Sequence, residues 1–350
     1  MNVKKIISTP PSPDEEGGAD PEVGTELLEF VVPLTDHGAR LDKCLAGQAA
    51  GLSRSYLQQL MGESCVRVNG RFVTKPSTAV KAGDVCQVDV KPTEQARSFV
   101  PQPMDLDVVF EDEHLLVVNK PAGLVVHPAA GNWTGTLLNG LLSHHDGAAH
   151  LPRAGIVHRL DKDTSGLMVV AKNRRTMDAL VELIAAREVT RLYLAVTGVA
   201  WSGETEVKVD AAIGRDPSNR LRMTVVNQAS GAGKSSQTQF RLLAAGTDAA
   251  LVGCKLFTGR THQIRVHLAA LKKIILGDSV YRGRQHPSIQ RQALHASRLI
   301  FVHPITQLKM DFQAPMPQDM VQACLEHDVA YNQALLSPSL FDANVPVRTF

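Results

Sequence analysis

Charged side chains are concentrated in one short stretch of the sequence, directly in front of an apolar run. Five of them fall within six positions: His158, Arg159, Asp161, Lys162 and Asp163. The run from Leu167 to Ala171 follows Gly166, a pattern typical of a buried strand. A single Asp before a strand usually forms only a turn. Asp161 is not isolated, since it stands in this charged cluster, and carboxylates are among the groups that can serve as nucleophile or base.

A second group of reactive residue types lies between positions 256 and 267, in the sequence Leu-Phe-Thr-Gly-Arg-Thr-His-Gln-Ile-Arg-Val-His. Gly259 is expected to break a strand, and Thr261 to cap a helix that carries His262 and Arg265 three positions apart on one face. His262 and His267 suggest a metal site, but a five-residue step separates them and no carboxylate stands between them. We therefore expect neither a metal nor a cofactor.

The segment from Thr190 to Val196 is expected to form a strand, in which alternate side chains face opposite sides of a sheet. Its aliphatic face would carry Leu192, Leu194 and Val196, which leaves Arg191, Tyr193 and Ala195 on the other face. Tyrosine in a strand is most often a packing residue, so this segment alone gives Tyr193 no function.

Several motifs together resemble those of the RluA family of RNA pseudouridine synthases. They are His-Arg-Leu-Asp at 158–161, Thr-Ser-Gly-Leu at 164–167, Arg-Leu-Tyr-Leu-Ala at 191–195, Thr-Gly-Arg-Thr-His-Gln-Ile-Arg at 258–265, Asn-Lys-Pro-Ala-Gly at 119–123 and Val-His-Pro at 126–128. The likeness extends from about residue 25 to residue 320. It is greatest to the RluD-type enzymes, which act on large-subunit ribosomal RNA.

The resemblance implies catalytic roles for Asp161, Tyr193 and Arg265. Asp161 would be the catalytic carboxylate, Tyr193 would pack against the target base, and Arg265 would pair with Asp161 and keep it charged. Arg159 would bind RNA by filling the gap that the flipped base leaves, after a flip that costs roughly a few kcal/mol. His127, next to a proline, is expected to be structural rather than a general base.

The implied reaction is an isomerisation that needs no cofactor. Uracil is detached from ribose at nitrogen 1, rotated and rejoined through carbon 5. Asp161 could attack carbon 1 of the ribose or act as a base at carbon 2, and the sequence leaves both routes open. The family fold is α+β, a long and mainly antiparallel mixed sheet with a central cleft that holds the catalytic Asp. Residues 283–292 form a shorter connection than relatives often carry, so the target uridines stay undefined.

One rival interpretation concerns the same carboxylate. The sequence Asp-Lys-Asp-Thr at 161–164 also fits the nucleophile loop of haloacid-dehalogenase-like phosphatases. In those enzymes the Asp pair follows a strand near the start of a doubly wound domain, whereas here the strand comes after the pair, in mid-chain. The order of the elements therefore favours the synthase.

Composition agrees with a globular protein of the cytoplasm. The chain has 350 residues, of which 44% are hydrophobic and 21% charged, and it contains no apolar run of the roughly 18 residues that a membrane span needs. Its five cysteines are scattered, without a Cys-x-x-Cys spacing, which indicates neither a disulfide framework nor a zinc site. We expect a monomer that works in a reducing compartment and does not bind membranes.

Changes in composition divide the chain into five parts. Residues 1–25, acidic and rich in Pro and Gly, are predicted to be a disordered tail. Residues 26–92 form a small α+β domain, 93–104 a proline-marked linker, 105–330 the catalytic domain and 331–350 a C-terminal tail.

Residues 26–92 are similar to the S4-type RNA-binding domain. A short helix is expected to start within residues 38–45, a second after the cap residue Ser53, and a hairpin at Asn69-Gly70. Residues 37–92 hold eight Lys and Arg against four carboxylates, a net charge of +4, whereas residues 1–36 hold two lysines against eight carboxylates, a net of −6. Clustered cations bind RNA phosphates without reading sequence. The candidates are Arg40, Lys43, Arg54, Arg67, Arg71 and Lys75.

The chain could also be a ribosome assembly factor that binds RNA on this fold without catalysis. Asp161, Tyr193 and Arg265 argue against this alternative, because a protein released from catalysis has no chemical need for all three. The partner expected under either interpretation is large-subunit ribosomal RNA or a pre-ribosomal particle.

Overall fold

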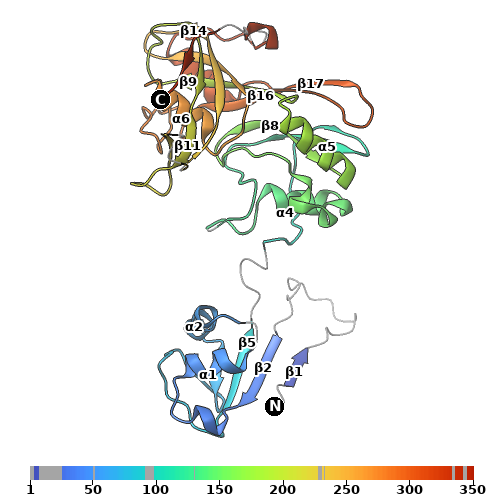
Figure 1. The fold of residues 1–350 in the computed structure, drawn as a ribbon, viewed down its shortest axis with the longest axis vertical. Coiled ribbons are helices and arrows are strands. Elements are labelled where there is room, and N and C mark those ends of the chain that lie inside the picture. Colours follow the sequence, from blue (N-terminus) through green and yellow to red (C-terminus); the bar gives the residue numbers. More distant parts are fainter. Residues whose placement is uncertain are drawn as a thin grey trace. The chain divides into compact units, whose positions relative to one another are not determined.

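The computed structural model describes residues 4–7, 26–49, 52–90, 98–129, 131–227, 231, 233–332, 336–341 and 345–350. The chain divides into two compact units, Met1–Arg97 and Ser98–Phe350, which are coloured from blue to red along the chain in Figure 1. Among the described residues, no helix is both long and apolar enough to cross a membrane.

The first unit is an α+β domain with one sheet. Its strands lie in the order β1 (Lys4–Ile7), β2 (Glu26–Val31), β5 (Val85–Val90), β3 (Val66–Val68) and β4 (Arg71–Phe72). Its helices are the 3-10 turn η1 (Leu34–Asp36), α1 (Leu41–Gln48) and α2 (Arg54–Gly62). The two predicted helices and the predicted hairpin are confirmed.

Local chemistry explains these elements. The Ser53 side chain accepts a hydrogen bond from the Tyr56 backbone N–H and so caps α2. Asn69 and Gly70 have φ values of 51° and 76°, the left-handed backbone that a tight hairpin requires. Apolar residues of both helices pack on the sheet, among them Leu41, Leu45, Leu57, Leu60 and Met61.

Strand β1 lies inside the segment for which we predicted disorder. It pairs antiparallel with β2, from Lys4 opposite Glu29 to Ile7 opposite Glu26. The acidic residues between these strands, 8–25, lie outside the described residues.

The second unit is built on a ten-stranded mixed sheet. Nine strands follow the order β18 (Val347–Arg348), β10 (Glu206–Asp210), β14 (Gln237–Ala245), β15 (Ala250–Leu256), β9 (Thr190–Thr197), β16 (Leu294–Val302), β8 (Ser165–Ala171), β7 (Leu115–Lys120) and β6 (Val108–Glu111), and β17 (Lys309–Gln313) pairs with β16. Of the described pairings only β16 with β8 and β10 with β18 are parallel. This mainly antiparallel sheet confirms the predicted fold class and rules out a doubly wound phosphatase domain.

Both faces of β7 and β8 are covered, which explains their continuous apolar sequences. On one face Leu116, Val118, Met168 and Val170 pack with apolar side chains of α4 (Leu137–His144). On the other face Leu115, Val117, Leu167 and Val169 pack with α5 (Arg174–Ala185), which lies beside β8 in Figure 1. The charged loop before β8 therefore enters a doubly covered part of the sheet.

A smaller sheet lies beside α6 (Gln263–Ala270), as Figure 1 shows for α6 and β11. It has the order β12 (Met223–Val226), β11 (Ala212–Arg215) and β13 (Gly233–Lys234). Ile213, Val266 and Tyr281 form a small core between it and the helix. The remaining elements are α7 (Gln318–Glu326) and the 3-10 turns η2 (Asp146–His150), η3 (Pro152–Gly155) and η6 (Pro338–Leu340).

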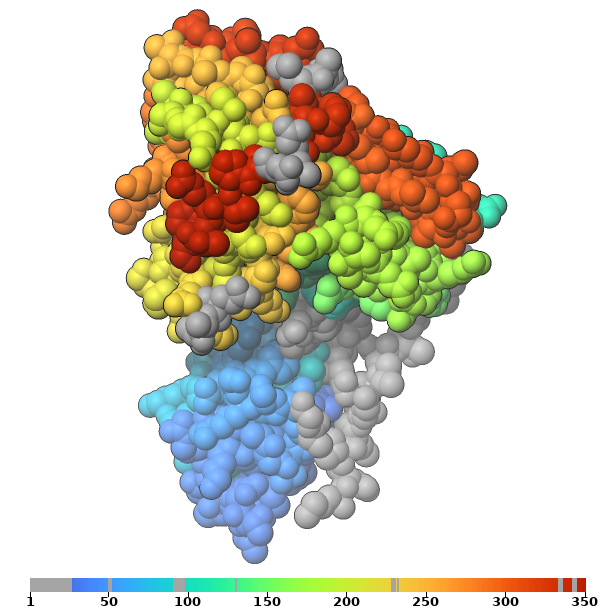
Figure 2. Space-filling view, turned by 45° about the horizontal axis from the view of Figure 1, so that its top comes forward, coloured from blue at the N-terminus to red at the C-terminus, as the bar shows by residue number. Residues whose placement is uncertain are grey.

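Both ends of the second unit, the catalytic unit of the predicted synthase, pack against its core, although the sequence predicted a linker at one end and a tail at the other. Asn139 donates to the carbonyl oxygens of Ser98 and Val100, so residues 98–104 of the predicted linker belong to this unit. In the segment that we set apart as a C-terminal tail, Leu336 and Phe341 are buried in the main core, and β18 pairs with β10. Figure 2 shows this red C-terminal segment on the surface of the catalytic unit.

Gly166, at the start of β8, is expected to be intolerant of a side chain. It has φ +116°, and an added Cβ would overlap the backbone of Ala296 in the neighbouring β16. Gly203 is a matched control, since it has φ +91° with open space around it. We expect Gly203→Ala to lower the free energy of unfolding by about 1 kcal/mol, because only the backbone of residue 203 is strained. Gly166→Ala should lower the free energy of unfolding by at least about 3 kcal/mol, because β16 must also move.

Chemical denaturation of the two variants measures this difference. Equal losses would show that β16 moves away from Gly166 without cost.

Candidate active site

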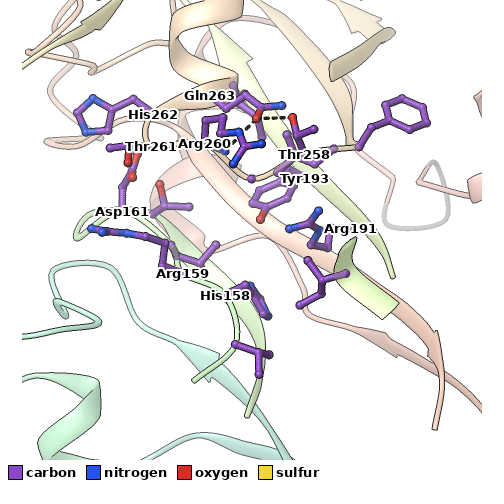
Figure 3. A pocket seen from close by; sticks show the side chains of 18 of the residues that line it. His158, Arg159, Asp161, Arg191, Tyr193, Thr258, Arg260, Thr261, His262 and Gln263 are labelled. Carbon is purple, nitrogen blue, oxygen red and sulfur yellow. Dashed lines mark hydrogen bonds between the residues drawn. The ribbon is translucent and has the colours of Figure 1, made fainter. Parts of the chain in front are cut away.

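One pocket of the catalytic unit collects the predicted catalytic residues. It has a volume of about 730 Å³ and is lined by residues from the loop before β8, from β9 and from the segment between β15 and α6. Asp161, Tyr193, Arg265 and Arg159 all line it, and Figure 3 shows three of them facing the same space. Among the described lining residues Asp161 is the only carboxylate, against six arginines: Arg153, Arg159, Arg187, Arg191, Arg260 and Arg265.

The guanidinium of Arg265 joins two carboxylates. Its Nη1 lies 3.1 Å from Asp161 Oδ2, and its Nε and Nη2 lie 2.7 and 2.8 Å from the two oxygens of Asp278. The side chains of Arg265 and Asp278 are 4% and 1% exposed, whereas that of Asp161 is 18% exposed. The bidentate pair with Asp278 fixes the plane of the guanidinium, and the remaining nitrogen orients the carboxylate that faces the pocket.

This arrangement fixes the charge of Arg265. Burial by itself would lower the pKa of Arg265, but the hydrogen bonds and charge of Asp278, followed by those of Asp161, outweigh burial and raise the pKa above its usual value. The arginine therefore stays charged beside Asp161. The pairing of Arg265 with Asp161, which the family resemblance implied, is thus present in the structure.

Backbone contacts hold the loop that carries Asp161. Lys120, 1% exposed, donates from Nζ to the carbonyl oxygens of Lys162, Pro121 and Leu124 at 2.8–2.9 Å. Arg291 donates to the carbonyl of Asp163 and forms a bidentate pair with Asp319. Burial lowers the pKa of Lys120 to about 7. Lys120 and Arg291 thus position the loop through its main chain, and they do not engage the Asp161 side chain.

Helix α6 begins one residue later than predicted. Its N-cap is His262, in a left-handed conformation with φ 58° and without a side-chain cap bond, so Thr261 is not the cap and His262 is not on the helical face of Arg265. The Gln263 side chain instead binds the turn that precedes the helix. Its Oε1 accepts from the Arg260 backbone N–H and the Thr258 hydroxyl.

Strand β9 places Tyr193 in the pocket wall as its alternation predicted. Arg191 and Tyr193 line the pocket, whereas Leu192 and Leu194 pack in the core. Burial raises the pKa of Tyr193 to about 12, so its hydroxyl stays protonated at neutral pH. Tyr193 can therefore pack and donate a hydrogen bond there, but it is not a base.

Burial keeps two histidines near the pocket, His127 and His267, neutral. Burial, followed by the charges of Arg159 and Arg153, lowers the pKa of His127 to about 4. His267 is fully buried, and its two ring nitrogens contact the hydroxyls of Ser236 and Thr238 at 3.0 and 2.9 Å. His267 therefore has no free nitrogen for a metal.

The candidate RNA-binding residues of the first unit are not equally free. Arg40 and Arg54 both donate through Nε and Nη2 to the buried Asp42, at 2.9–3.1 Å. The hydrogen bonds of Arg40, followed by those of Gln58 and Arg54, hold the pKa of Asp42 below its usual range. They outweigh burial, which by itself would raise this pKa. Arg67 is half-buried, pairs with Asp89 and covers the Phe72 ring. The exposed candidates are Arg40, Lys43, Arg54, Arg71 and Lys75.

Sequence reasoning missed three residues of the site. Asp278 holds Arg265, and Tyr281 lies 5.0 Å below that guanidinium while its hydroxyl contacts His262 Nδ1 at 3.0 Å. Lys120 holds the loop. Asp278 and Tyr281 lie in a segment without regular periodicity, and nothing in the sequence indicates that Lys120 turns inward.

Comparison with known proteins identifies the family of this chain. The RNA pseudouridylate synthase family model matches residues 114–270, and the S4 domain model matches residues 39–86. The ribosomal large subunit pseudouridine synthase D of Neisseria meningitidis serogroup A is 46% identical over 306 residues, which cover 84% of this chain and 80% of the relative. The chain belongs to the RNA pseudouridylate synthase family. The motif resemblance is thus confirmed, and so is the S4 domain.

Two further relatives support the assignment to the RNA pseudouridylate synthases. The protein named ribosomal large subunit pseudouridine synthase D in Escherichia coli strain K12 is 43% identical over 309 residues, covering 84% of this chain and 92% of the relative. Among solved structures, human RNA pseudouridylate synthase domain containing 4 has a TM-score of 0.52 at 27% identity, covering 64% of this chain and 94% of that one.

Asp278→Asn tests whether Asp278 positions the site. The change keeps one acceptor for Arg265 and removes the charge, so the guanidinium and Asp161 lose their fixed geometry. We expect the single-turnover rate of pseudouridine formation to fall about tenfold to a hundredfold, because a shift of 1 Å at a reacting group costs about 10²-fold. RNA affinity should stay unchanged.

Asp311→Asn is the matched control, since Asp311 forms a similar bidentate pair with Arg298 at 2.7–2.8 Å and does not line the pocket. Equal rate losses in both variants would show that Asp278 acts through general stability.

Proposed function

We propose that this protein converts uridines of large-subunit ribosomal RNA to pseudouridine, with Asp161 as the essential group. The observation that carries the proposal is the ion pair of Asp161 and Arg265 at the edge of the pocket, 3.1 Å apart. The names of the relatives supply the substrate class. A carboxylate oriented toward the pocket by a buried arginine is what either route of the reaction requires.

In the first route Asp161 attacks carbon 1 of the ribose, and the electron pair of the glycosidic bond leaves with nitrogen 1 of the base. In the second route Asp161 removes the proton from carbon 2, and the same bond breaks to give a glycal and the same uracil anion. The base then rotates, and carbon 5 bonds to carbon 1 of the ribose. In the first route this bond displaces the Asp161 carboxylate, and in the second route Asp161 returns its proton to carbon 2. Carbon 5 then loses its proton, and nitrogen 1 takes one up. No electron acceptor or group donor enters the balance.

The target nucleotide must leave its stack to reach Asp161. A pocket of about 730 Å³ is in the range of about 300–1,000 Å³ typical of small-ligand sites, which suits one flipped nucleoside. Arg159 is exposed at the pocket and has no hydrogen bond or ion pair within the described parts of the chain. It is therefore available to occupy the gap in the RNA.

The S4 domain supplies a second contact with RNA. Asp42 holds the guanidinium groups of Arg40 and Arg54 from one side, which leaves their outer edges exposed. Prepositioned arginines lose less conformational entropy on binding phosphate than free ones do. Arg40 and Arg54 are thus our preferred phosphate contacts, with Lys43, Arg71 and Lys75 around them and Arg67 engaged with Asp89.

The compartment that we propose is the cytoplasm. All five cysteines are free and buried. Burial raises the pKa of the Cys254 thiol. Burial, followed by the negative charge of Asp84, also raises the pKa of the Cys86 thiol. Thiols of this kind fit a reducing environment.

Asp161→Asn is expected to lower the rate of pseudouridine formation by at least about 10³-fold. Removal of a catalytic acid or base typically lowers the rate by about 10²–10⁴-fold, and both routes need the carboxylate of Asp161. RNA affinity should stay within a few-fold. Asp163→Asn, the same change two residues along the loop, should keep most of the activity. The assay maps pseudouridine by carbodiimide and primer extension on unmodified large-subunit RNA.

Full turnover in Asp161→Asn would overturn the role of Asp161. Tight binding by the wild-type protein without any turnover would instead support the assembly-factor alternative.

Removal of the S4 domain should weaken RNA binding and spare the chemical step. A chain that starts at Thr93 keeps every contact of Ser98 and all pocket residues. Each lost phosphate contact flattens the dependence of log affinity on log salt concentration by about 0.9, so we expect a smaller slope and unchanged single-turnover rates at saturating RNA. A slope equal to that of the full chain would mean that the cations of the S4 domain do not contact RNA.

A further inference from the structure

Arg191 is a buried cation without a partner. It belongs to β9, is 5% exposed and has no hydrogen bond or ion pair among the described residues, and its Nε is fully buried and unsatisfied. Other arginines of the unit with little exposure are paired: Arg265 with Asp161 and Asp278, Arg291 with Asp319 and Arg298 with Asp311. Burial of an uncompensated charge lowers stability, so Arg191 calls for a functional explanation.

The guanidinium lies in the pocket wall beside Tyr193. Arg191 and Tyr193 stand two positions apart on one face of β9 and both line the pocket. In Figure 3 the nitrogens of Arg191 lie next to the hydroxyl end of Tyr193. Burial lowers the pKa of Arg191, but an arginine in a protein keeps its proton. The pocket therefore holds a positive charge that no described carboxylate neutralises.

A second unsatisfied donor lines the same pocket. Nε2 of His158 accepts a hydrogen bond from the Val169 backbone N–H at 3.1 Å, which places the proton of the neutral ring on Nδ1. That Nδ1 is buried and has no partner. Burial, followed by the charge of Arg191, lowers the pKa of His158 to about 3, so the ring is neutral. A ligand that completes both groups must carry acceptor atoms.

We propose that Arg191 binds a carbonyl oxygen of the target uracil and stabilises the negative charge that the base acquires when its bond to ribose breaks. The proposal rests on the proposed function. When the bond between carbon 1 of the ribose and nitrogen 1 breaks, its electron pair stays with the base and spreads onto the two carbonyl oxygens. A fixed positive group at one of these oxygens lowers the barrier. Both routes open to Asp161 pass through this anion, so the role of Arg191 is the same in each.

Depth in the pocket favours the base over an RNA phosphate as the partner of Arg191. A flipped nucleotide enters base first, so its phosphates remain at the rim. Four pocket arginines are exposed and suit phosphate: Arg153, Arg159, Arg187 and Arg260. Arg191, in contrast, is buried and has no carboxylate partner among the described residues. It also adjoins Tyr193, the residue that we expect to pack against the base.

The test compares Arg191→Met and Arg191→Lys in the full chain, with large-subunit RNA transcribed in vitro. At saturating RNA we expect the single-turnover rate of Arg191→Met to fall about 10²–10³-fold, as when one donor to a developing anion is removed, with the dissociation constant for RNA within threefold. Arg191→Lys keeps the charge and should recover at least tenfold of the loss. Arg191→Met should also raise the midpoint of thermal unfolding by a few degrees, since it removes a buried unpaired charge.

Arg298→Met is the matched control, because Arg298 is paired with Asp311 and lies outside the pocket. It should lower the thermal midpoint and leave the rate unchanged. If Arg191→Met does not fold, Arg191→Gln replaces it, since glutamine retains a donor without the charge.

A better leaving group separates a chemical role from a structural one. Fluorine at carbon 5 stabilises the uracil anion, so RNA that contains 5-fluorouridine should depend less on Arg191. We expect the rate loss of Arg191→Met to be at least tenfold smaller on this RNA, measured as the chromatographic loss of 5-fluorouridine from nuclease digests. Equal losses on the two RNAs would overturn the proposal in favour of a structural role.

Two other results are distinguishable. Weaker RNA binding by Arg191→Met with an unchanged rate at saturation would overturn the proposal in favour of a phosphate contact. An inactive wild-type protein would overturn the proposed function itself.

Discussion

The catalytic unit depends on the ion pairs of one buried guanidinium. Arg265 comes from α6, Asp161 from the loop before β8, and Asp278 from the segment after α6, and the three meet within 3.1 Å. Two carboxylates on one arginine leave a net negative charge in a largely buried place, which is stable only with well-made hydrogen bonds. Asp278 binds two nitrogens of the guanidinium, so that the third orients Asp161, the proposed catalytic residue, at the pocket.

The sheet determines where this charge can lie. Strands β7 and β8 are covered by α4 on one face and α5 on the other, so the loop before β8 is anchored to a well-packed part of the sheet. Two basic side chains also secure that loop through its backbone: Lys120 through Lys162, and Arg291 through Asp163. Side chains from the loop can then face the pocket without having to hold the loop in place.

Paired and unpaired cations have different roles in this fold. Arg265, Arg291 and Arg298 have carboxylate partners and stabilise the arrangement of their segments. Arg40 and Arg54 share one carboxylate, Asp42, and keep their outer edges free. Arg191 has no partner within the described residues. A site that must stabilise charge during a reaction retains such a group at the expense of folding stability.

From the sequence alone the fold class, most elements and the candidate catalytic residues that line the pocket could be predicted. Ser53, Asn69-Gly70 and the apolar run after Gly166 act through local rules of caps, turns and burial, and β9 follows the two-residue alternation of a strand, so these features were readable. The tertiary structure alone decided the pairing of Asp278 with Arg265, the inward turn of Lys120, the start of α6 at Gln263 and the isolation of Arg191. Each of these features depends on residues that are distant in the sequence or on a competing hydrogen bond. The periodicity of apolar residues in the sequence does not indicate such contacts.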